Sequence, residues 1–534
     1  MAITSAFRSF GTLFSMIFFG AFMACTSPQN DTNKTLEERF PFEEFTIEQL
    51  HEGYLEGAFG VRDVVQAYHQ RIEAIDQNGP ALHAIIQLNP DALAIADQMD
   101  QALLAGDQKG ALFGVPVLLK DNIDTHDGMN TTAGSRALKD SYPLKDSYVA
   151  QKLREAGAII IGKANLSEWA NFRGELSSSG WSGLGGQTKN PYVLDRNPCG
   201  SSSGSAVAVS ANLCMLAVGT ETNGSIVCPS HINGIVGIKP TVGLVSRSGV
   251  IPISFTQDTP GPMARNVHDA AIMLGAMTGV DSADRKTLAS EGHFYTDYTR
   301  FLHRDGLKGK RLGLFRPAFG QHYKVDEIML KTVDYLRAQG AEVVDVEQVI
   351  TAEVEAASFE IMLYEYKDGL NNYFASLGEN APVKNVEELI AFNKTDSVEL
   401  KFFNQKYLEM ALEKGDLNSP DYLKALAIVE KGSREMGIDR VMDELQLDAI
   451  IAPTGSPAWK TDHLNGDHYQ LGTSSEAAIS GYPNITVPMG FVDDLPVGIS
   501  FYGRAWSEPK LIEIAYAFEQ AANQRKAPQF LTTD

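Results

Sequence analysis

Cysteine is scarce in this sequence, and no metal-binding spacing is present. The 534 residues include four cysteines, Cys25, Cys199, Cys214 and Cys228. None of them forms a Cys-x-x-Cys pair, and no group of cysteine and histidine has the spacing of a zinc site. We therefore expect no metal. Cys214 and Cys228 lie in apolar or tightly turned sequence, which predicts that both are small buried hydrophobic residues.

Positive charge is scarce as well. Lysine and arginine total 45 residues against 67 aspartates and glutamates, which gives a formal net charge of -22. A surface of that sign repels phosphate backbones, so nucleic acid is not expected as a partner. The acidity is typical of a soluble protein surface.

Linkers and repeats are missing from residue 40 onward. Apolar residues make up 44% of the chain and charged residues 21%, which allows a large buried core. We expect one domain over residues 39–534. The region at about 350–445 is richer in helix formers and charge, and we interpret it as a helical excursion from that domain, lining or covering the site entrance.

A long uncharged run occurs near the N-terminus, over residues 9–24, and it follows Arg8. It is short for a membrane span but suits the apolar part of a signal peptide. It ends in Ala24-Cys25, which resembles a bacterial lipoprotein signal. We predict a signal peptide over residues 1–24, lipidation of Cys25, and a polar tether over residues 25–38.

This prediction places the mature protein outside the cytoplasm, lipid-anchored to the bacterial cell envelope on its periplasmic side. A plain secretory signal and an uncleaved anchor are the alternatives, and both also imply export. If Cys25 is lipidated, three cysteines remain, so at most one disulfide can form.

Helical and strand patterns alternate along the chain. The apolar run 159–161 predicts a strand, and residues 166–170 then have helical spacing. Residues 329–336 predict a helix that Gly340 ends, and 343–346 predict another strand. This alternation indicates an α/β fold with a large mixed β-sheet covered by helices on both faces.

One lysine stands at the end of an apolar strand. The segment 114–122, GVPVLLKDN, brings Lys120 to the end of a run that requires burial. Burial disfavours the charged amine and lowers its pKa, so Lys120 is a candidate general base.

Two serines lie in turns rich in glycine and serine. Ser201 lies in CGSSSGS, residues 199–205, which predicts a loop that opens a helix. Ser225 follows a predicted strand in GTETNGSI, residues 219–226, where the chain turns on small residues. The backbone N–H groups of Thr222, Asn223, Gly224 and Ser225 form a candidate oxyanion hole.

Together these segments resemble the amidase signature family of serine hydrolases. Further matching stretches are 254–265, 448–454 and 481–488, and the resemblance covers about Phe45 to Ala521. It implies a Ser–cis-Ser–Lys triad in which Ser225 is the nucleophile, Ser201 the bridging serine after a cis peptide bond, and Lys120 the base. It implies no cofactor.

The phrases NPCGSSSGSAVAVSANL and TETNGSIVCP are similar to those of bacterial peptide amidases. The resemblance therefore implies hydrolysis of C-terminal peptide amides or small carboxamides to an acid and ammonia. Cys199, Ser203 and Asn223 replace glycines of the family pattern. Asn tolerates positive φ, so the oxyanion turn is expected to survive.

Three alternatives stay open. Residues 200–204 also fit G-x-S-x-G, the nucleophile elbow of α/β-hydrolase esterases, with Ser202 as nucleophile, although the polar segment before it is no buried strand. The second alternative is a component of a tRNA-dependent amidotransferase, which the predicted export signal and the acidity of the chain disfavour. A binding protein without activity is a third. His231, close to Ser225, is interpreted as a structural residue.

Overall fold

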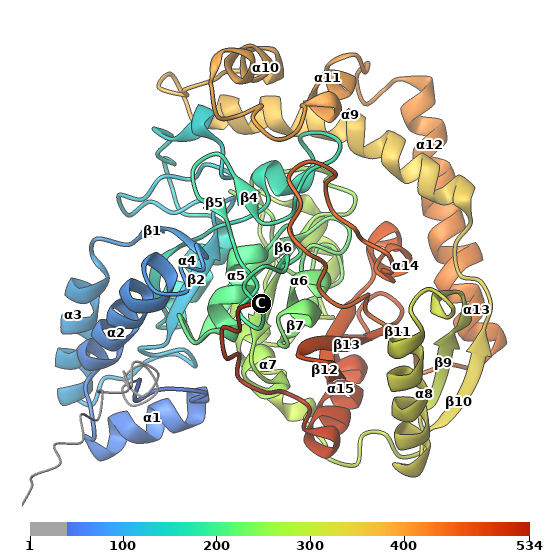
Figure 1. Cartoon of the computed structure of the whole chain (residues 1–534), viewed down its shortest axis with the longest axis horizontal. Helices are drawn as coiled ribbons and strands as arrows, with labels where there is room; N and C mark the ends of the chain where they lie inside the picture. The colour runs from blue at the N-terminus through green and yellow to red at the C-terminus, as the bar shows by residue number, and fades with distance from the viewer. Residues whose placement is uncertain (1–39, 534) are drawn as a thin grey trace, which may run out of the picture. The chain divides into compact units, whose positions relative to one another are not determined.

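An 11-stranded mixed sheet forms the core of the part of the chain that the computed structural model describes, residues 40–533 (Figure 1). Its strand order is β1-β3-β2-β6-β8-β7-β12-β13-β11-β9-β10. The strands are β1 (Ile85–Leu88), β2 (Pro116–Lys120), β3 (Ile159–Ala164), β6 (Leu216–Glu221), β7 (Val236–Lys239), β8 (Thr259–Ala264), β9 (Arg311–Phe315), β10 (Glu342–Val346), β11 (Ala449–Pro453), β12 (Asn484–Val492) and β13 (Leu495–Tyr502).

Both parallel and antiparallel pairs occur in this sheet. Strand β2 lies between β3 and β6 and is parallel to both. Strands β8, β7, β12 and β13 continue the sheet through antiparallel pairs, and β11, β9 and β10 end it with parallel pairs. A separate two-stranded ribbon joins β4 (Trp181–Ser182) to β5 (Gly186–Gln187).

Fifteen α-helices are found among residues 40–533. They are α1 (Ile47–Glu56), α2 (Val61–Arg71), α3 (Ala92–Leu104), α4 (Tyr148–Glu155), α5 (Ser203–Ser210), α6 (Val227–Ile232), α7 (Val267–Met277), α8 (Tyr323–Ala338), α9 (Ala352–Ser376), α10 (Val386–Thr395), α11 (Lys406–Leu412), α12 (Pro420–Glu430), α13 (Asp439–Glu444), α14 (Ser475–Ser480) and α15 (Glu508–Ala522). Shorter 3-10 segments lie between them, and π-helical turns extend α2 (Ile72–Gln77) and α12 (Lys431–Ile438).

Helices cover both faces of the sheet, as strand β13 shows. A methyl group at Gly498 would lie 2.7 Å from Cβ of His231, so this face of β13 packs on α6. Phe501 points to the opposite face, because side chains alternate along a strand. Its ring packs 5.8 Å from that of Phe518 on α15. All eight residues of β13 are buried, as expected for a strand covered on both sides. The predicted α/β fold is therefore confirmed.

Two local predictions differ from the structure. The strand predicted at 159–161 continues through Gly162 to Ala164. The helix expected at 166–170 is a single irregular 3-10 turn, in which Trp169 and Ala170 have φ of 51° and 53°. Tertiary packing explains this, because Trp169 is buried against Phe374 of α9 instead of continuing a helix.

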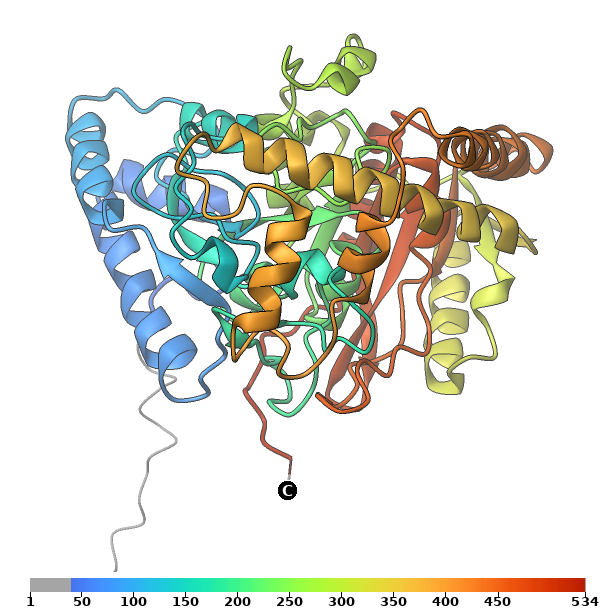
Figure 2. The same ribbon diagram turned by 90° about the horizontal axis from the view of Figure 1, so that it is seen from above.

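The region at about 350–445 is formed by α9 to α13. Helix α9 runs along the top of Figure 1, and Figure 2 shows it crossing the molecule. Its buried side chains join those of α10 and α11 in one hydrophobic cluster with Trp169 and Phe172. This cluster connects the helical region to the segment that follows β3, close to the site described below.

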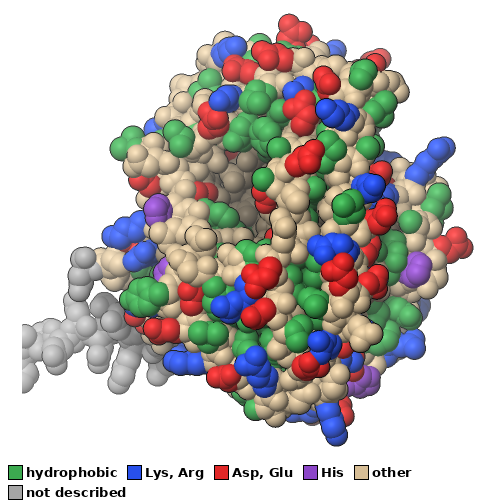
Figure 3. Space-filling model, turned by 90° about the vertical axis from the view of Figure 1, so that its right-hand side faces the viewer, with side chains coloured by type: hydrophobic (Ala, Val, Ile, Leu, Met, Phe, Trp, Pro, Cys, Tyr) green, Lys and Arg blue, Asp and Glu red, His purple; other side chains and the backbone are tan. Residues whose placement is uncertain are grey.

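Residues 42–533 belong to one compact unit. The predicted signal peptide over residues 1–24, the lipidation site Cys25 and the tether over residues 25–38 lie outside the described residues. Within residues 40–533, none of the helices has the length and apolar character needed to span a bilayer. Figure 3 shows one face of the molecule, where acidic and basic side chains are interspersed around a hollow.

Candidate active site

Lys120 is the last residue of β2, a strand buried along its whole length. Its Nζ lies 2.7 Å from Oγ of Ser201, and it also donates to the carbonyl oxygen (3.2 Å) and hydroxyl oxygen (2.8 Å) of Thr220. Burial lowers the pKa of the amine to about 7, although the carboxylates of Asp258 and Glu221 oppose this effect. The side chain is therefore poised to lose its proton near neutral pH.

Ser201 lies in the loop that leads into α5, as the sequence predicts. The Gly200–Ser201 peptide bond is cis. The carbonyl oxygen of Ser201 accepts the N–H of Ser167 at 3.0 Å, and the residue is fully buried. The loop thus presents the Ser201 hydroxyl to Lys120.

Ser225 follows β6, where the chain turns before the short helix α6. The carboxylate of Glu221, the last residue of β6, accepts the N–H groups of Gly224 (2.8 Å), Ile226 (2.8 Å) and Val227 (3.1 Å). This carboxylate fixes the shape of the turn. Ser225 is 9% exposed and lies on the wall of a cavity.

The structure brings Lys120 and Ser201 into direct contact and places Ser225 on the adjoining loop. The backbone N–H of Ser202 donates to the carbonyl oxygen of Ser225 at 3.2 Å. The Ser225 hydroxyl makes no hydrogen bond to any residue of the described range 40–533. Contacts of this kind often tighten only when substrate binds.

One N–H group of the predicted oxyanion hole has an acceptor within the protein. The N–H of Gly224 donates to Glu221 at 2.8 Å. The N–H groups of Thr222, Asn223 and Ser225 have no acceptor among residues 40–533. The carboxamide of Asn223 is held by the hydroxyls of Ser474 (2.7 Å) and Ser475 (3.2 Å), which also line the cavity and restrain the turn.

The structure does not support Ser202 as an alternative nucleophile, and it places His231, interpreted as a structural residue, in the core. Ser202 is fully buried, and its hydroxyl bonds to both backbone groups of Thr220 at 3.1 Å, so it is not presented as a nucleophile. No strand immediately precedes it, which an elbow requires. His231 is buried in α6, and burial lowers its pKa to about 3. Its two ring nitrogens have no hydrogen-bond partner in the described part of the chain.

The cavity at Ser225 has a volume of about 540 Å³. Its wall includes aromatic side chains, Phe172, Tyr407 and Trp459, and Met362 of α9. The helical region therefore contributes to the lining through α9 and α11.

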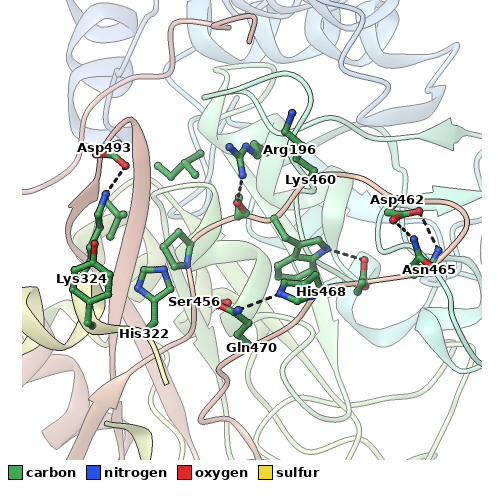
Figure 4. A pocket seen from close by; sticks show the side chains of 18 residues that line it. Arg196, His322, Lys324, Ser456, Lys460, Asp462, Asn465, His468, Gln470 and Asp493 are labelled. Carbon is green, nitrogen blue, oxygen red and sulfur yellow. Dashed lines mark hydrogen bonds and ion pairs between the residues drawn. The ribbon is translucent and has the colours of Figure 1, made fainter. Parts of the chain in front are cut away.

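A second cavity of about 690 Å³ shares lining residues with the first, and Figure 4 shows the side chains around it. Trp459 and Asp467 line both cavities, and the indole N–H of Trp459 donates to Asp467 at 3.0 Å. Lys324 points along this second cavity and pairs with Asp493 at 2.9 Å.

Sequence reasoning missed a disulfide. Cys228, predicted to be a small buried hydrophobic residue, is buried but forms a disulfide with Cys199, a pair that was not identified from the sequence. The pair could not be recognised from spacing, because the two loops that carry it meet only in the folded chain. Cys214 is free and buried, as predicted.

Glu221 was missed as well. An acidic residue between a strand and a turn of small residues is the signal that could have indicated it. No group of side chains within residues 40–533 has the composition of a metal site.

Comparison with known proteins identifies the family. The Amidase family model matches residues 63–512. The chain belongs to the Amidase family. A probable amidase of Arabidopsis thaliana is 42% identical over 93% of this chain and 93% of its own length. The crystal structure of native peptide amidase from Stenotrophomonas maltophilia is 48% identical, with a TM-score of 0.89, and the match covers 92% of this chain and 100% of that one.

The relatives also include a component of an amidotransferase. A glutamyl-tRNA(Gln) amidotransferase chain from Thermoanaerobacter pseudethanolicus is 32% identical over 91% of this chain and 98% of its own length. The identity is lower than to the amidases. This amidase is accordingly an amide-hydrolysing enzyme of the amidase signature type.

Proposed function

We propose that this amidase hydrolyses C-terminal amides of peptides, or small carboxamides, to a carboxylic acid and ammonia through an acyl-enzyme on Ser225. The observation that carries the proposal is the 2.7 Å contact between fully buried Lys120 and Ser201, beside Ser225 on a cavity wall. This arrangement gives a serine nucleophile a base near neutral pH without histidine.

The proposed reaction is a proton relay. Neutral Lys120 takes the proton of Ser201, Ser201 takes the proton of Ser225, and Oγ of Ser225 attacks the amide carbon. The oxyanion that forms is stabilised by the N–H groups of Thr222, Asn223 and Ser225. The relay returns the proton to the leaving nitrogen, and ammonia departs. Water then cleaves the acyl-enzyme to give the acid and restores the Ser225 hydroxyl.

Two findings support peptide amides as the substrate. The similarity to a peptide amidase structure is close, at 48% identity over 92% of the chain. The cavity is lined by Phe172, Tyr407 and Trp459, which can pack against the side chains of a peptide. Among the described residues, its lining contains the carboxylates of Glu175 and Asp467 but no lysine, arginine or histidine, so it offers no cation to a free C-terminal carboxylate, which suits an uncharged amide terminus.

A panel of amides tests the proposal. Ammonia release is measured with peptide amides, aliphatic amides and aryl amides, for the wild type and for Ser225→Ala. We expect the peptide amides to give the highest kcat/KM, and Ser225→Ala to abolish release. A preference for aryl or aliphatic amides would overturn the substrate class. Full activity in Ser225→Ala would overturn the nucleophile.

The amidotransferase alternative is tested with the same preparation. The purified chain is assayed alone, without ATP, tRNA or added partner proteins. Hydrolysis of peptide amides under these conditions is expected for an independent amidase. A requirement for a partner protein would favour the amidotransferase function instead.

We also propose that the protein is exported and anchored through lipidated Cys25, because the sequence over residues 1–25 is similar to a lipoprotein signal. Cell fractionation of the wild type and Cys25→Ala tests this proposal. The wild type is expected in the membrane fraction. An equal distribution of the two proteins would show that Cys25 carries no anchor.

A further inference from the structure

We propose that the Cys199–Cys228 disulfide positions the two serine loops for the reaction, so that its reduction lowers catalysis while the fold persists. The inference rests on the proposed roles of Ser201 and Ser225. The bond lies between the two loops that carry these serines. Cys199 is two residues before Ser201, and Cys228 is three residues after Ser225.

The disulfide joins the loop that carries Ser201 covalently to the segment that carries Ser225. The Cα atoms of Cys199 and Cys228 are 6.1 Å apart, and 29 positions separate them along the chain. It is also the one disulfide within residues 40–533. Cys199 precedes Ser201 along the chain, and Cys228 follows Ser225. A link this short therefore limits how far the two serine loops can move apart.

Three sets of hydrogen bonds also join the two segments. The N–H of Ser202 donates to the Ser225 carbonyl oxygen at 3.2 Å, the Ser202 hydroxyl bonds to Thr220, and Asn233, just after α6, donates to the carbonyl oxygen of Pro198 at 2.9 Å. Helix α6, which begins at Val227, spans six residues, and the Glu221 carboxylate accepts the N–H of Val227 at its start. Glu221 thus fixes the near end of the turn that carries Ser225, and the disulfide fixes its far end.

The contact between Lys120 and Ser201 does not depend on this link. Lys120 reaches Ser201 from β2, which belongs to the buried sheet. Reduction should therefore leave the base and the bridging serine together while the placement of Ser225 varies. Displacement of a reacting group by about 1 Å can lower a rate by about 100-fold. The expected effect is on kcat more than on KM.

A small dithiol can reach the bond through the substrate cavity. Both cysteines are more than nine-tenths buried, yet both line the cavity beside Ser225. Reduction transfers two electrons and two protons from the dithiol, which becomes a cyclic disulfide, and leaves the thiols of Cys199 and Cys228. An amide substrate or inhibitor in the cavity should slow this step.

The proposal also bears on where the enzyme works. Thiol pools keep such bonds reduced in most cytosols, whereas exported proteins retain them. A catalytic dependence on this bond would agree with the export predicted from residues 1–25.

The first experiment treats folded, oxidised wild type with dithiothreitol under anaerobic conditions. Thiols are counted, and peptide-amide hydrolysis, circular dichroism and the rate of Ser225 labelling by a fluorophosphonate are followed. We expect kcat and the labelling rate to fall about tenfold or more as two thiols appear. KM should stay within about threefold, secondary structure should be unchanged, and reoxidation should restore activity.

Variants supply the matched controls. The double variant C199S/C228S should resemble reduced wild type and should not respond to dithiothreitol. Cys214→Ala, which removes the free buried cysteine, should keep wild-type kcat and the full response to reductant. If the double variant does not fold, the reduction experiment on the wild type still tests whether catalysis depends on the disulfide.

Two outcomes would overturn the proposal. One is unchanged kcat and labelling rate after complete reduction of the bond. The other is a lower thermal stability with no change in kcat, which would make the bond only structural. Failure of the proposed function can be distinguished from failure of this inference. If the proposed function is wrong, the oxidised enzyme hydrolyses none of the amides, but the labelling rate still reports on the positioning of Ser225.

Discussion

Two lysines of neighbouring strands, Lys120 and Lys163, show how similar side chains acquire different tasks. Both are fully buried, and burial lowers the pKa of each. Lys120 pairs in register with Ala164, and Leu119 pairs with Lys163, so the two amines leave opposite faces of the sheet. Lys120 contacts Ser201 on one face of the sheet. Lys163 contacts a buried network of polar groups on the other face.

The network around Lys163 is structural in character. Its Nζ donates to the carbonyl oxygen of Ile123 at 2.5 Å and to the hydroxyl of Thr131 at 2.8 Å. The carboxylates of Asp121 and Asp124 favour its charged form. Lys120 contacts the hydroxyl of Ser201, whereas Lys163 contacts no serine of the site in the described structure. The comparison indicates that neighbouring groups, and not burial alone, distinguish the proposed base from a structural lysine.

The largest effect is expected from Lys120→Met. Methionine fills a similar volume but provides no base, so kcat/KM should fall by about 10²- to 10⁴-fold. Peptide-amide hydrolysis at neutral pH measures the change, and circular dichroism checks the fold. Wild-type activity in this variant would refute the relay through Lys120.

The matched substitution Lys163→Met should give the opposite pattern. It removes two buried hydrogen bonds and the cation that faces Asp121 and Asp124, which should cost on the order of 3 kcal/mol of unfolding free energy. The kcat of the folded fraction should stay close to the wild type. Denaturant unfolding and kinetics below the transition measure both quantities. A large loss of kcat in folded Lys163→Met would break the comparison.

The next largest effect is expected in the pH dependence of kcat/KM. The pKa of Lys120 is lowered to about 7, and the reaction needs the neutral amine. The kcat/KM should therefore be highest above pH 7 and fall about tenfold per pH unit well below it, because protonated Lys120 cannot accept a proton.

Thr220→Val sharpens the pH prediction. It removes a hydroxyl that accepts from Lys120 at 2.8 Å and so stabilises the charged amine. The acid limb should move to lower pH by about half a unit to one unit. An acid limb that is flat in the wild type, or unmoved in this variant, would assign the titration to another group.

The smallest effect is expected from Tyr373→Phe, on the Lys163 side. Its hydroxyl donates to Asp124 at 2.8 Å, and burial raises the pKa of that carboxyl to about 7. Loss of the hydrogen bond should lower stability by about 1–2 kcal/mol and leave kcat and its pH profile unchanged. A shifted acid limb would show that the two lysine environments are coupled.

Much of this arrangement could be predicted from local pattern. The apolar run before Lys120, and the small residues around Ser201 and Ser225, indicated strand ends and turns that the structure contains. The turn at 166–170 could not be predicted, because packing of Trp169 against α9 overrides its helical spacing. The position of Glu221 between a strand and a turn of small residues was a signal, but its three backbone donors could not be predicted, because they meet the carboxylate only after the chain folds back.

The sequence by itself determined the family, the α/β pattern and the three candidate side chains, because motif residues and hydrophobic periodicity are local properties. Only the tertiary structure decided which buried lysine touches a serine, that the N–H of Gly224 donates to Glu221, and that Cys199 bonds to Cys228. These facts depend on which faces and loops meet in space. Strand register and loop packing fix such contacts across long separations in the chain.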